Sequence, residues 1–273
     1  MNRKSLSISN IAWNPEIDEK VACILSKHGL RYIDIAPSKY FKNFHTTTLS
    51  EVQELKEWWK KRNIDIYGFQ SLLYGVGDKN IFRSKEDRWY LKKHLEKVFW
   101  IAQNLGACFL TFGSPKNRDI KGLSQCEVND ISYDFFWEIG ELASAYGVVF
   151  CVEPNPEQYG ANFLTSTQSA YEFVKKLNHK NVRMQLDSGT ILLNEESLDF
   201  QNFKDSVGHI HISREFLRPI YDSPSEGLEK VIDALASLAA PVLTIEMLHN
   251  DKISVLEQID LSISFLSECL ENA

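Results

Sequence analysis

VVFCVE at residues 148–153 is a short apolar run of the kind that forms a buried strand, and it ends in a glutamate. Three later runs have the same form, and a helix-like segment follows each of them. They are NVRMQLD (181–187), VGHIH (207–211) and PVLTIE (241–246). Strands that alternate with helices build a parallel sheet, so these runs predict an α/β fold.

The four runs end in side chains that bind metal ions, which are Glu153, Asp187, His211 and Glu246. In parallel sheets of this kind, functional groups gather at the carboxyl ends of the strands. Three carboxylates and one imidazole at that edge predict a divalent-metal site with mixed oxygen and nitrogen ligands. Mn²⁺, Mg²⁺ or Co²⁺ suits such a set, and Zn²⁺ is a further candidate. An ordinary half-buried strand with a charged end would explain one such run, but not four in succession.

Side-chain alternation within these runs separates a polar face from an apolar one. Cys151 and Val149 share the face of Glu153, and His209 shares the face of His211. The opposite face is apolar in all four runs, as expected if helices cover it. The polar face carries groups into the protein, which costs free energy unless they are paired or bind an ion. We expect His209, one layer below His211, to be a hydrogen-bonded core residue.

The whole chain repeats a strand followed by a helix eight times. The first four predicted strands are 6–13, 29–36, 64–70 and 107–113, and the predicted helices lie near 17–28, 49–62, 85–106, 127–147, 165–178, 196–204, 225–239 and 251–270. Eight such units with right-handed crossovers predict a closed (β/α)8 TIM barrel with eight parallel strands, as a single domain over residues 1–273. A doubly wound open sheet is the alternative. Its glycine-rich phosphate turn is missing, because the turn after the first strand reads AWNPEIDE (12–19).

Composition limits the class of protein further. The chain has 273 residues, enough for one barrel of about 250. Its net charge of −7 argues against nucleic acid as a partner. The five cysteines show no CxxC spacing and are expected to be reduced thiols. The first residues, MNRKSLSISN, have no apolar signal segment, and no run approaches the length of a membrane span. We therefore expect a soluble cytoplasmic protein without a membrane partner.

The loop after the fourth predicted strand, GSPKNR (113–118), carries two cations at the rim where the carboxylates lie. Lys116 and Arg118 could hold an anionic substrate such as a phosphate. A solvated turn with ordinary surface charge is the alternative for both residues.

Three further residues are candidate substrate contacts. Asn155 follows Glu153 by two residues and could meet a substrate oxygen, or it could simply form the turn. Arg218 lies in the loop after the seventh strand and could clamp the substrate, with a surface role as the alternative. Gln70 stands at the end of the third strand, on the same rim.

These residues resemble a known group, the xylose isomerase-like TIM-barrel superfamily and within it the sugar phosphate isomerase/epimerase branch. The resemblance covers essentially the whole chain. It implies a homodimer of the kind common in this group, and it implies that Glu153, Asp187, His211 and Glu246 are the family's Glu/Asp/His/Glu metal ligands. It rests on SNIAWNPE (9–16), YIDIAPS (32–38), FGSPKNR (112–118), EPNP (153–156), LDSGT (186–190), HIHIS (209–213) and TIEM (244–247).

The chain also departs from members of this superfamily. Ketose 3-epimerases of the group commonly have a histidine three residues after the metal aspartate, where this chain has Thr190. Their substrate arginine would correspond to Arg218, at a spacing that is one residue longer. The endonuclease IV group adds histidines at the ends of strands three and four and a D-x-H after strand seven. This chain has Gln70 and Gly113 at those ends and Tyr221-Asp222-Ser223 in the loop, so it lacks most of the added ligands.

The resemblance and the quartet together predict an enzyme that isomerises or epimerises a sugar or a sugar phosphate. We expect a bound ion to hold a carbonyl and a neighbouring hydroxyl, so that an enediolate forms. Glu153 or Glu246 would move the proton, while Asp187 and His211 hold the ion. A dehydratase or lyase on a keto-polyol shares the enediolate step and is the alternative. Phosphodiester hydrolysis, which needs several metals and a basic groove, and a catalytically inactive sugar-binding barrel are further alternatives.

Overall fold

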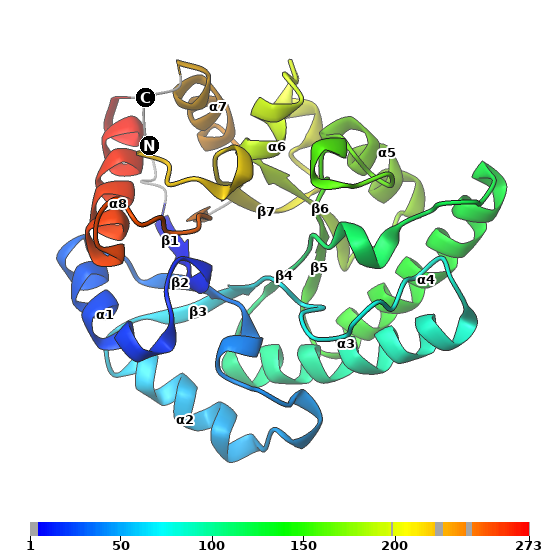
Figure 1. The fold of residues 1–273 in the computed structure, drawn as a ribbon, viewed down its shortest axis with the longest axis horizontal. Coiled ribbons are helices and arrows are strands. Elements are labelled where there is room, and N and C mark those ends of the chain that lie inside the picture. Colours follow the sequence, from blue (N-terminus) through cyan, green and yellow to red (C-terminus); the bar gives the residue numbers. More distant parts are fainter. Residues whose placement is uncertain (1–4, 198, 222–225, 239–241, 273) are drawn as a thin grey trace.

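The protein is a closed barrel of parallel strands in the order β1 to β8, with helices around it (Figure 1). A computed structural model describes residues 5–197, 199–221, 226–238 and 242–272. The strands are β1 (Ser5–Ser9), β2 (Tyr32–Ile35), β3 (Asp65–Phe69), β4 (Phe109–Phe112), β5 (Val149–Val152), β6 (Val182–Asp187), β7 (Val207–Ile212) and β8 (Val242–Ile245). The predicted (β/α)8 barrel is therefore confirmed.

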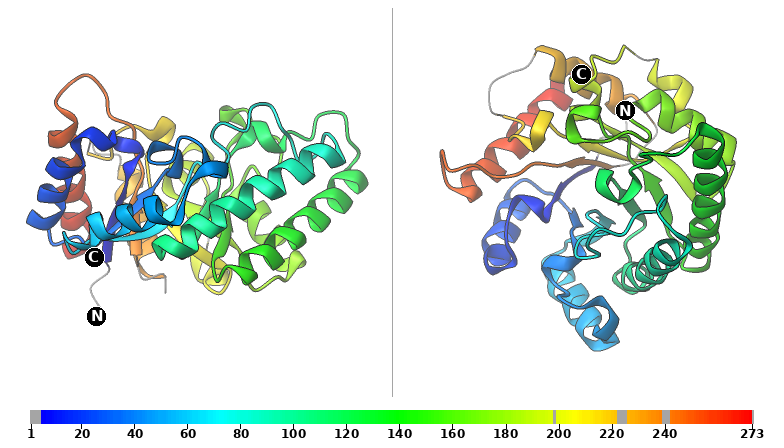
Figure 2. Two further views of the ribbon diagram at one scale, coloured as in Figure 1. Left: turned by 90° about the horizontal axis from the view of Figure 1, so that it is seen from below. Right: turned by 45° about the vertical axis from the view of Figure 1, so that its right-hand side comes forward.

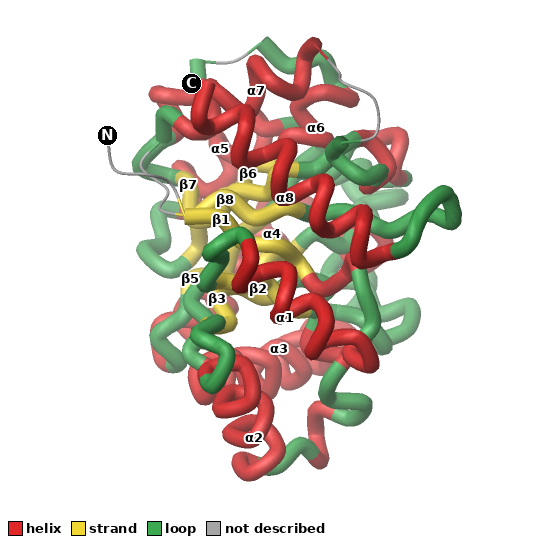
Figure 3. Tube along the Cα trace, turned by 90° about the vertical axis from the view of Figure 1, so that its left-hand side faces the viewer, coloured by secondary structure: helices red, strands yellow, loops and turns green. Residues whose placement is uncertain are grey.

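A helix follows each strand and covers the outside of the barrel, as the views in Figures 2 and 3 show. Among the described residues, no helix is both long and apolar enough to cross a membrane. The single-domain organisation, the cytoplasmic location and the homodimer stay predictions. The helices are α1 (Asp18–Lys27), α2 (Leu49–Lys60), α3 (Lys85–Leu105), α4 (Gln125–Ala145), α5 (Thr167–Leu177), α6 (Ser188–Leu193), α7 (Glu226–Ala236) and α8 (Val255–Asn272).

The sixth helix is where the sequence prediction was wrong. We predicted it near 196–204, but α6 begins at Ser188, directly after β6. The reason is a cap, because the Asp187 side chain accepts a hydrogen bond from the backbone N–H of Thr190 at 2.7 Å. The described residues of the predicted range form a single short 3₁₀ helix, Phe200–Phe203. Residue 198 of the predicted sixth helix, residues 225 and 239 of the predicted seventh helix and residue 241 of the predicted last strand lie outside the described residues.

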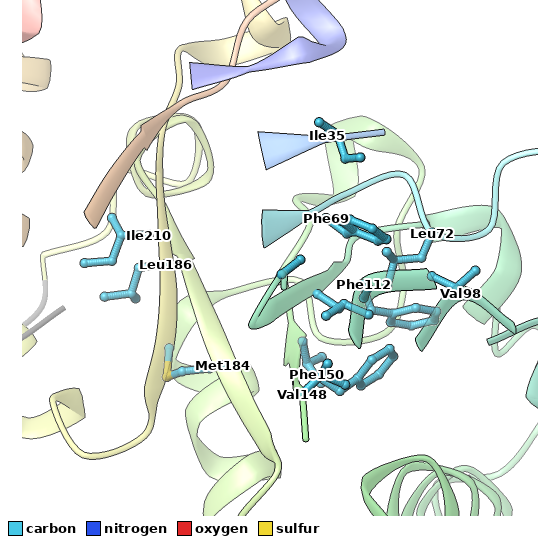
Figure 4. Packing of buried hydrophobic residues seen from close by; sticks show 14 of the residues in the cluster. Ile35, Phe69, Leu72, Val98, Phe112, Val148, Phe150, Met184, Leu186 and Ile210 are labelled. Carbon is cyan, nitrogen blue, oxygen red and sulfur yellow. The ribbon is translucent and has the colours of Figure 1, made fainter. Parts of the chain in front are cut away.

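The apolar face of the strands packs against the helices and forms the main core. Phe112 of β4 and Phe150 of β5 lie with ring centroids 5.3 Å apart, and Figure 4 shows both beside Val98 of α3. Phe136 of α4 contacts both rings from the helix side. Burial of each such side chain stabilises the fold by about 1.5–3 kcal/mol. This shell holds the strands in place from outside and leaves the inner face free for polar groups.

The interior of the barrel is polar around its middle and aromatic towards the start of the strands. Tyr32, Tyr67 and Phe109 form a chain of ring contacts, and His209 stacks on Phe109 at a centroid distance of 5.8 Å. His209 Nε2 lies 2.6 Å from Asp34 Oδ2, so His209 is the hydrogen-bonded core residue that we predicted. These rings pack inside the barrel on the side of the site that faces the start of the strands.

Candidate metal centre

The ends of β5, β6, β7 and β8 bring four ligand-type side chains together. Glu153 directly follows β5, Asp187 ends β6, His211 lies in β7 and Glu246 directly follows β8. One ligand atom from each of the four lies within 4.8 Å of the others. All four side chains are buried, and His211 is fully inaccessible to solvent. Parallel pairing sets this arrangement, since Asp187 is the register partner of His211.

The cluster is electrostatically unfavourable without a cation. Burial, and then the charges of Glu246 and Asp187, raise the pKa of Glu153 to about 8. Burial and the charge of Glu246 also raise the pKa of Asp187. Burial alone would lower the pKa of His211, but Glu246 and Asp34 outweigh it and raise that pKa well above its usual value. A divalent ion would neutralise the carboxylates and take the place of these protons.

The donor set fits such an ion. His211 Nδ1 points at the cluster, 3.3 Å from Glu246 Oε2 and 4.0 Å from Glu153 Oε1. It makes no hydrogen bond within the described part of the chain, although it is fully buried. An imidazole nitrogen that has no hydrogen-bond partner in the described structure and lies among three carboxylates is a ligand arrangement for Mn²⁺, Mg²⁺, Co²⁺ or Zn²⁺.

Amide donors hold the Glu153 carboxylate on both sides. Asn155 Nδ2 donates to Glu153 Oε2 at 3.2 Å, and Gln185 Nε2 donates to Oε1 at 3.1 Å. Each amide is itself oriented, because Arg118 donates to Asn155 Oδ1 at 2.5 Å and Thr111 donates its hydroxyl to Gln185 Oε1. An arginine can only donate, so the NH₂ group of Asn155 must face the glutamate.

The other two carboxylates are also fixed by hydrogen bonds. Gln70 Nε2 donates to Glu246 Oε1 at 2.7 Å, which leaves Oε2 facing His211. Ser213 donates its hydroxyl to Asp187 Oδ2 at 2.7 Å. The other oxygen of Asp187 caps α6, so the aspartate joins the cluster to the start of a helix.

Comparison with known proteins assigns the chain to a family. The family model described as xylose isomerase-like TIM barrel matches residues 24–269. The chain belongs to this family. No curated protein sequence matches the chain.

Solved structures with the same fold as this xylose isomerase-like barrel include several sugar epimerases. D-psicose 3-epimerase from Clostridium cellulolyticum H10, solved with D-tagatose, is 18% identical with a TM-score of 0.77, over 97% of this chain and 99% of that one. A 3-keto-D-glucoside 4-epimerase from E. coli is 16% identical with a TM-score of 0.76, over 97% and 100%. A sugar phosphate isomerase/epimerase from Parabacteroides distasonis ATCC 8503 is 13% identical with a TM-score of 0.70, over 97% and 94%.

The predicted substrate contacts of this xylose isomerase-like barrel lie in different surroundings. Asn155 and Gln70 contact the ligand carboxylates directly. Arg118 is buried and donates to the Glu153 carbonyl oxygen at 2.6 Å, while burial lowers its pKa to about 10. Lys116 is exposed on the rim. Arg218 is exposed as well, and its Nη2 lies 3.0 Å from Glu215 Oε2. Contact of these five residues with a substrate stays a prediction.

Sequence reasoning missed several residues around the site. Asp34, Thr111 and Gln185 come from the middle of strands, and Ser213 follows β7. Asp34 could have been recognised from the sequence, because an aspartate between two isoleucines in a strand is a buried charge that needs a partner. Nothing local indicates that Gln185 reaches Glu153, because that contact joins two strands.

Proposed function

We propose that the protein is a divalent-metal-dependent epimerase or isomerase of a ketose or a ketose phosphate. The observation that carries the proposal is the pair Glu153 and Glu246, which reach one buried site from two strands that are not neighbours. Epimerisation removes a proton from one face of a carbon and returns one to the other face, so it is served by two carboxylates around one substrate position. The ligand set supports a metal-assisted reaction at that position.

The hydrogen bonds of the four ligand residues suggest a different role for each. A divalent ion bound at this site supplies Lewis-acid stabilisation of the negative charge that develops on the substrate oxygens. Asp187 and His211, held by Ser213 and by β7, would keep the site in shape. Glu246 receives one strong amide hydrogen bond on Oε1, which orients Oε2 towards the centre as a proton acceptor. Glu153 would act as its counterpart on the opposite side of the substrate.

The comparisons support a reaction beside a ketone. The names of two similar structures, a D-psicose 3-epimerase and a 3-keto-D-glucoside 4-epimerase, each describe inversion at a carbon next to a carbonyl. The hydrogen on such a carbon is acidified by the carbonyl, so a glutamate can remove it. A dehydratase would begin with the same step and then expel a hydroxyl group. No contact in the described structure favours that second step, so we place the epimerase or isomerase first.

The test is proton exchange with solvent. Wild-type protein loaded with Mn²⁺ is incubated in D₂O with a panel of free ketoses and ketose phosphates, and each sugar is analysed by NMR and mass spectrometry. We expect deuterium at a carbon next to the carbonyl. We also expect an epimer or an aldose that is an isomer of the substrate, with a mass that differs only by the deuterium taken up. A product lighter by one water molecule would favour the dehydratase. Absence of exchange with the whole panel in metal-loaded protein would contradict the proposal.

A further inference from the structure

His211 has a second nitrogen that faces away from the metal centre, towards a buried carboxylate. His211 Nε2 lies 3.5 Å from Asp34 Oδ2, while Nδ1 faces Glu246 and Glu153. Asp34 Oδ2 also lies 2.6 Å from His209 Nε2. Asp34 and His211 are fully inaccessible to solvent, and His209 nearly so. A carboxylate therefore sits between two imidazoles inside the barrel, directly below the cluster.

We propose that Asp34 is a positioning residue that keeps the proton of His211 on Nε2, so that Nδ1 remains free to bind the ion. A neutral imidazole carries one N–H, and its other nitrogen has the lone pair that a metal needs. Asp34 is the acceptor that faces Nε2 in the described part of the barrel. Histidine ligands commonly donate their second N–H to a carboxylate, which fixes both tautomer and ring orientation. The inference rests on the proposed metal-dependent function.

The fold makes room for this carboxylate. The register between β2 and β3 shifts after Ile33, which places Gly68 opposite Asp34. A Cβ on Gly68 would lie 2.5 Å from Asp34 Oδ2, so only glycine leaves space there. Because a bulge redirects side chains locally, this irregularity is a means of aiming Asp34 at the histidines. A buried carboxylate is costly unless it is paired, and Asp34 is paired with His209 and also faces His211.

His209 serves the same arrangement without reaching the metal centre. Its ring is clamped by a stacked contact with Phe109 and a tilted contact with Tyr67. Its Nε2 supplies the short contact that anchors Asp34 Oδ2. The rings of His209 and His211 meet edge to face, with centroids 4.9 Å apart. Phe109 and Tyr67 therefore hold the His209 ring in place, and His209 anchors Asp34. Asp34 in turn faces His211.

The first test uses wild-type protein alone and does not depend on activity. Protein labelled with ¹⁵N in its histidines is loaded with Zn²⁺, and the two ring nitrogens of His211 are distinguished by NMR. We expect Nδ1 to bind the metal and Nε2 to carry a hydrogen-bonded proton. Metal binding through Nε2, or a second Zn²⁺ held by Asp34 and both histidines, would overturn the proposal. Failure to bind any metal would instead contradict the proposed function itself.

The second test compares Mn²⁺ affinity by calorimetry in three folded variants. Asp34→Asn is expected to bind about 10- to 100-fold more weakly, because an amide can also donate to Nε2 and favour the wrong tautomer. His209→Gln retains Asp34 and a side-chain donor for it, so we expect a smaller loss of affinity than in Asp34→Asn. Asp18→Asn removes another buried carboxylate, which accepts from Trp13 Nε1 at 2.7 Å, and should change stability but not affinity.

Two results in this series would overturn the inference. Wild-type affinity in Asp34→Asn would mean that the carboxylate serves only the packing of the core. An equal loss in Asp34→Asn and His209→Gln would assign the effect to the Asp34–His209 pair and not to His211. If Asp34→Asn does not fold, the NMR test on wild-type protein decides the matter.

Discussion

Glu153 and Glu246 differ in how their oxygens are held, and this difference determines what each can do. Both oxygens of Glu153 accept amide hydrogen bonds, from Asn155 and Gln185. Glu246 has one such bond, from Gln70, and its other oxygen faces His211. Glu246 is therefore the less constrained base, and Glu153 the more rigid one.

The first prediction at this scale is Glu246→Gln. The change keeps the shape of the side chain but removes its basicity, so the rate of deuterium exchange into a ketose substrate should fall by about 10²–10⁴-fold. Exchange is measured by NMR with saturating Mn²⁺. Glu138→Gln, at an exposed glutamate paired with Lys92, is the control and should exchange at the wild-type rate. Full activity in Glu246→Gln would remove it as a proton carrier.

The second prediction concerns pH. The folded metal-free protein holds a proton on Glu153 up to about pH 8, whereas the unfolded chain releases it near the ordinary value of 4.5. The native state binds more protons in this window, so the stability of the metal-free protein should fall as pH rises through it. Scanning calorimetry of chelator-treated protein measures the effect.

Glu153→Gln provides the comparison for this pH effect. The variant lacks the titrating carboxyl, so its stability should decline less than that of the wild type between about pH 5 and about pH 8. The difference between the two declines should be at most about 1.4 kcal/mol per pH unit. Saturating Mn²⁺ should stabilise the wild type more at the upper end of the window, because protons then compete less with the ion. Identical pH profiles for the two metal-free proteins would refute this account of the site.

The residues that the sequence did and did not reveal differ in a physical way. The four ligand types stand at strand ends, where alternation and parallel pairing bring them to one rim, so their convergence could be predicted from one chain. Gln185 donates to Glu153 at the end of the neighbouring strand β5, whereas Asp34 of β2 reaches across the barrel to His209 and His211 of β7. Each of these contacts joins side chains on different strands, so local sequence patterns do not encode it.

Among the elements, the close approach of β4 to β5 shapes the site. Gly113 follows β4, and a Cβ at that position would overlap the Glu153 carboxylate. We named Gly113 only as the end of a strand without a histidine, yet its lack of a side chain is what admits Glu153. The same contact explains why the fourth strand contributes space to the centre and not a ligand.

The third prediction is Gly113→Ala. The new methyl group must displace Glu153, so Mn²⁺ affinity measured by calorimetry should fall by about tenfold or more. Gly140→Ala is the matched control, because its Cβ would collide with the His179 ring, away from the cluster. We expect the control to lose about 1–3 kcal/mol of stability and to retain its affinity. Unchanged affinity in Gly113→Ala would show that Glu153 is not needed where the structure places it.

The fourth prediction concerns the loops after β4 and β5, which Arg118 joins. Arg118→Met leaves the Glu153 carbonyl and Asn155 Oδ1 without their buried donor, and should lower the free energy of unfolding by about 1–3 kcal/mol. Chemical denaturation measures this loss. Lys93→Met removes an exposed cation paired with Glu96 and should cost at most about 1 kcal/mol. An equally small loss in Arg118→Met would mean that the loops hold their shape without it.

At the scale of the whole molecule, repetition made the barrel predictable. Eight strand-and-helix units, each with a short strand and an amphipathic helix, leave few arrangements that bury every apolar face. The exception, α6, begins within the site because Asp187 both caps it and faces the cluster. Such a dual role is not visible in periodicity, so the departure from the regular pattern falls at the functional end.

The most direct test of the central claim is the metal content of protein purified without chelator, measured per chain beside Asp187→Asn. The account predicts about one divalent ion per wild-type chain, because the four ligands form one site. It predicts that Asp187→Asn loses most of the bound metal, because the variant lacks one of the charged ligands. No ion in the wild type, even after addition of Mn²⁺, would contradict the metal centre and the chemistry built on it. Two or three ions per chain would contradict the single-ion site and favour phosphodiester hydrolysis.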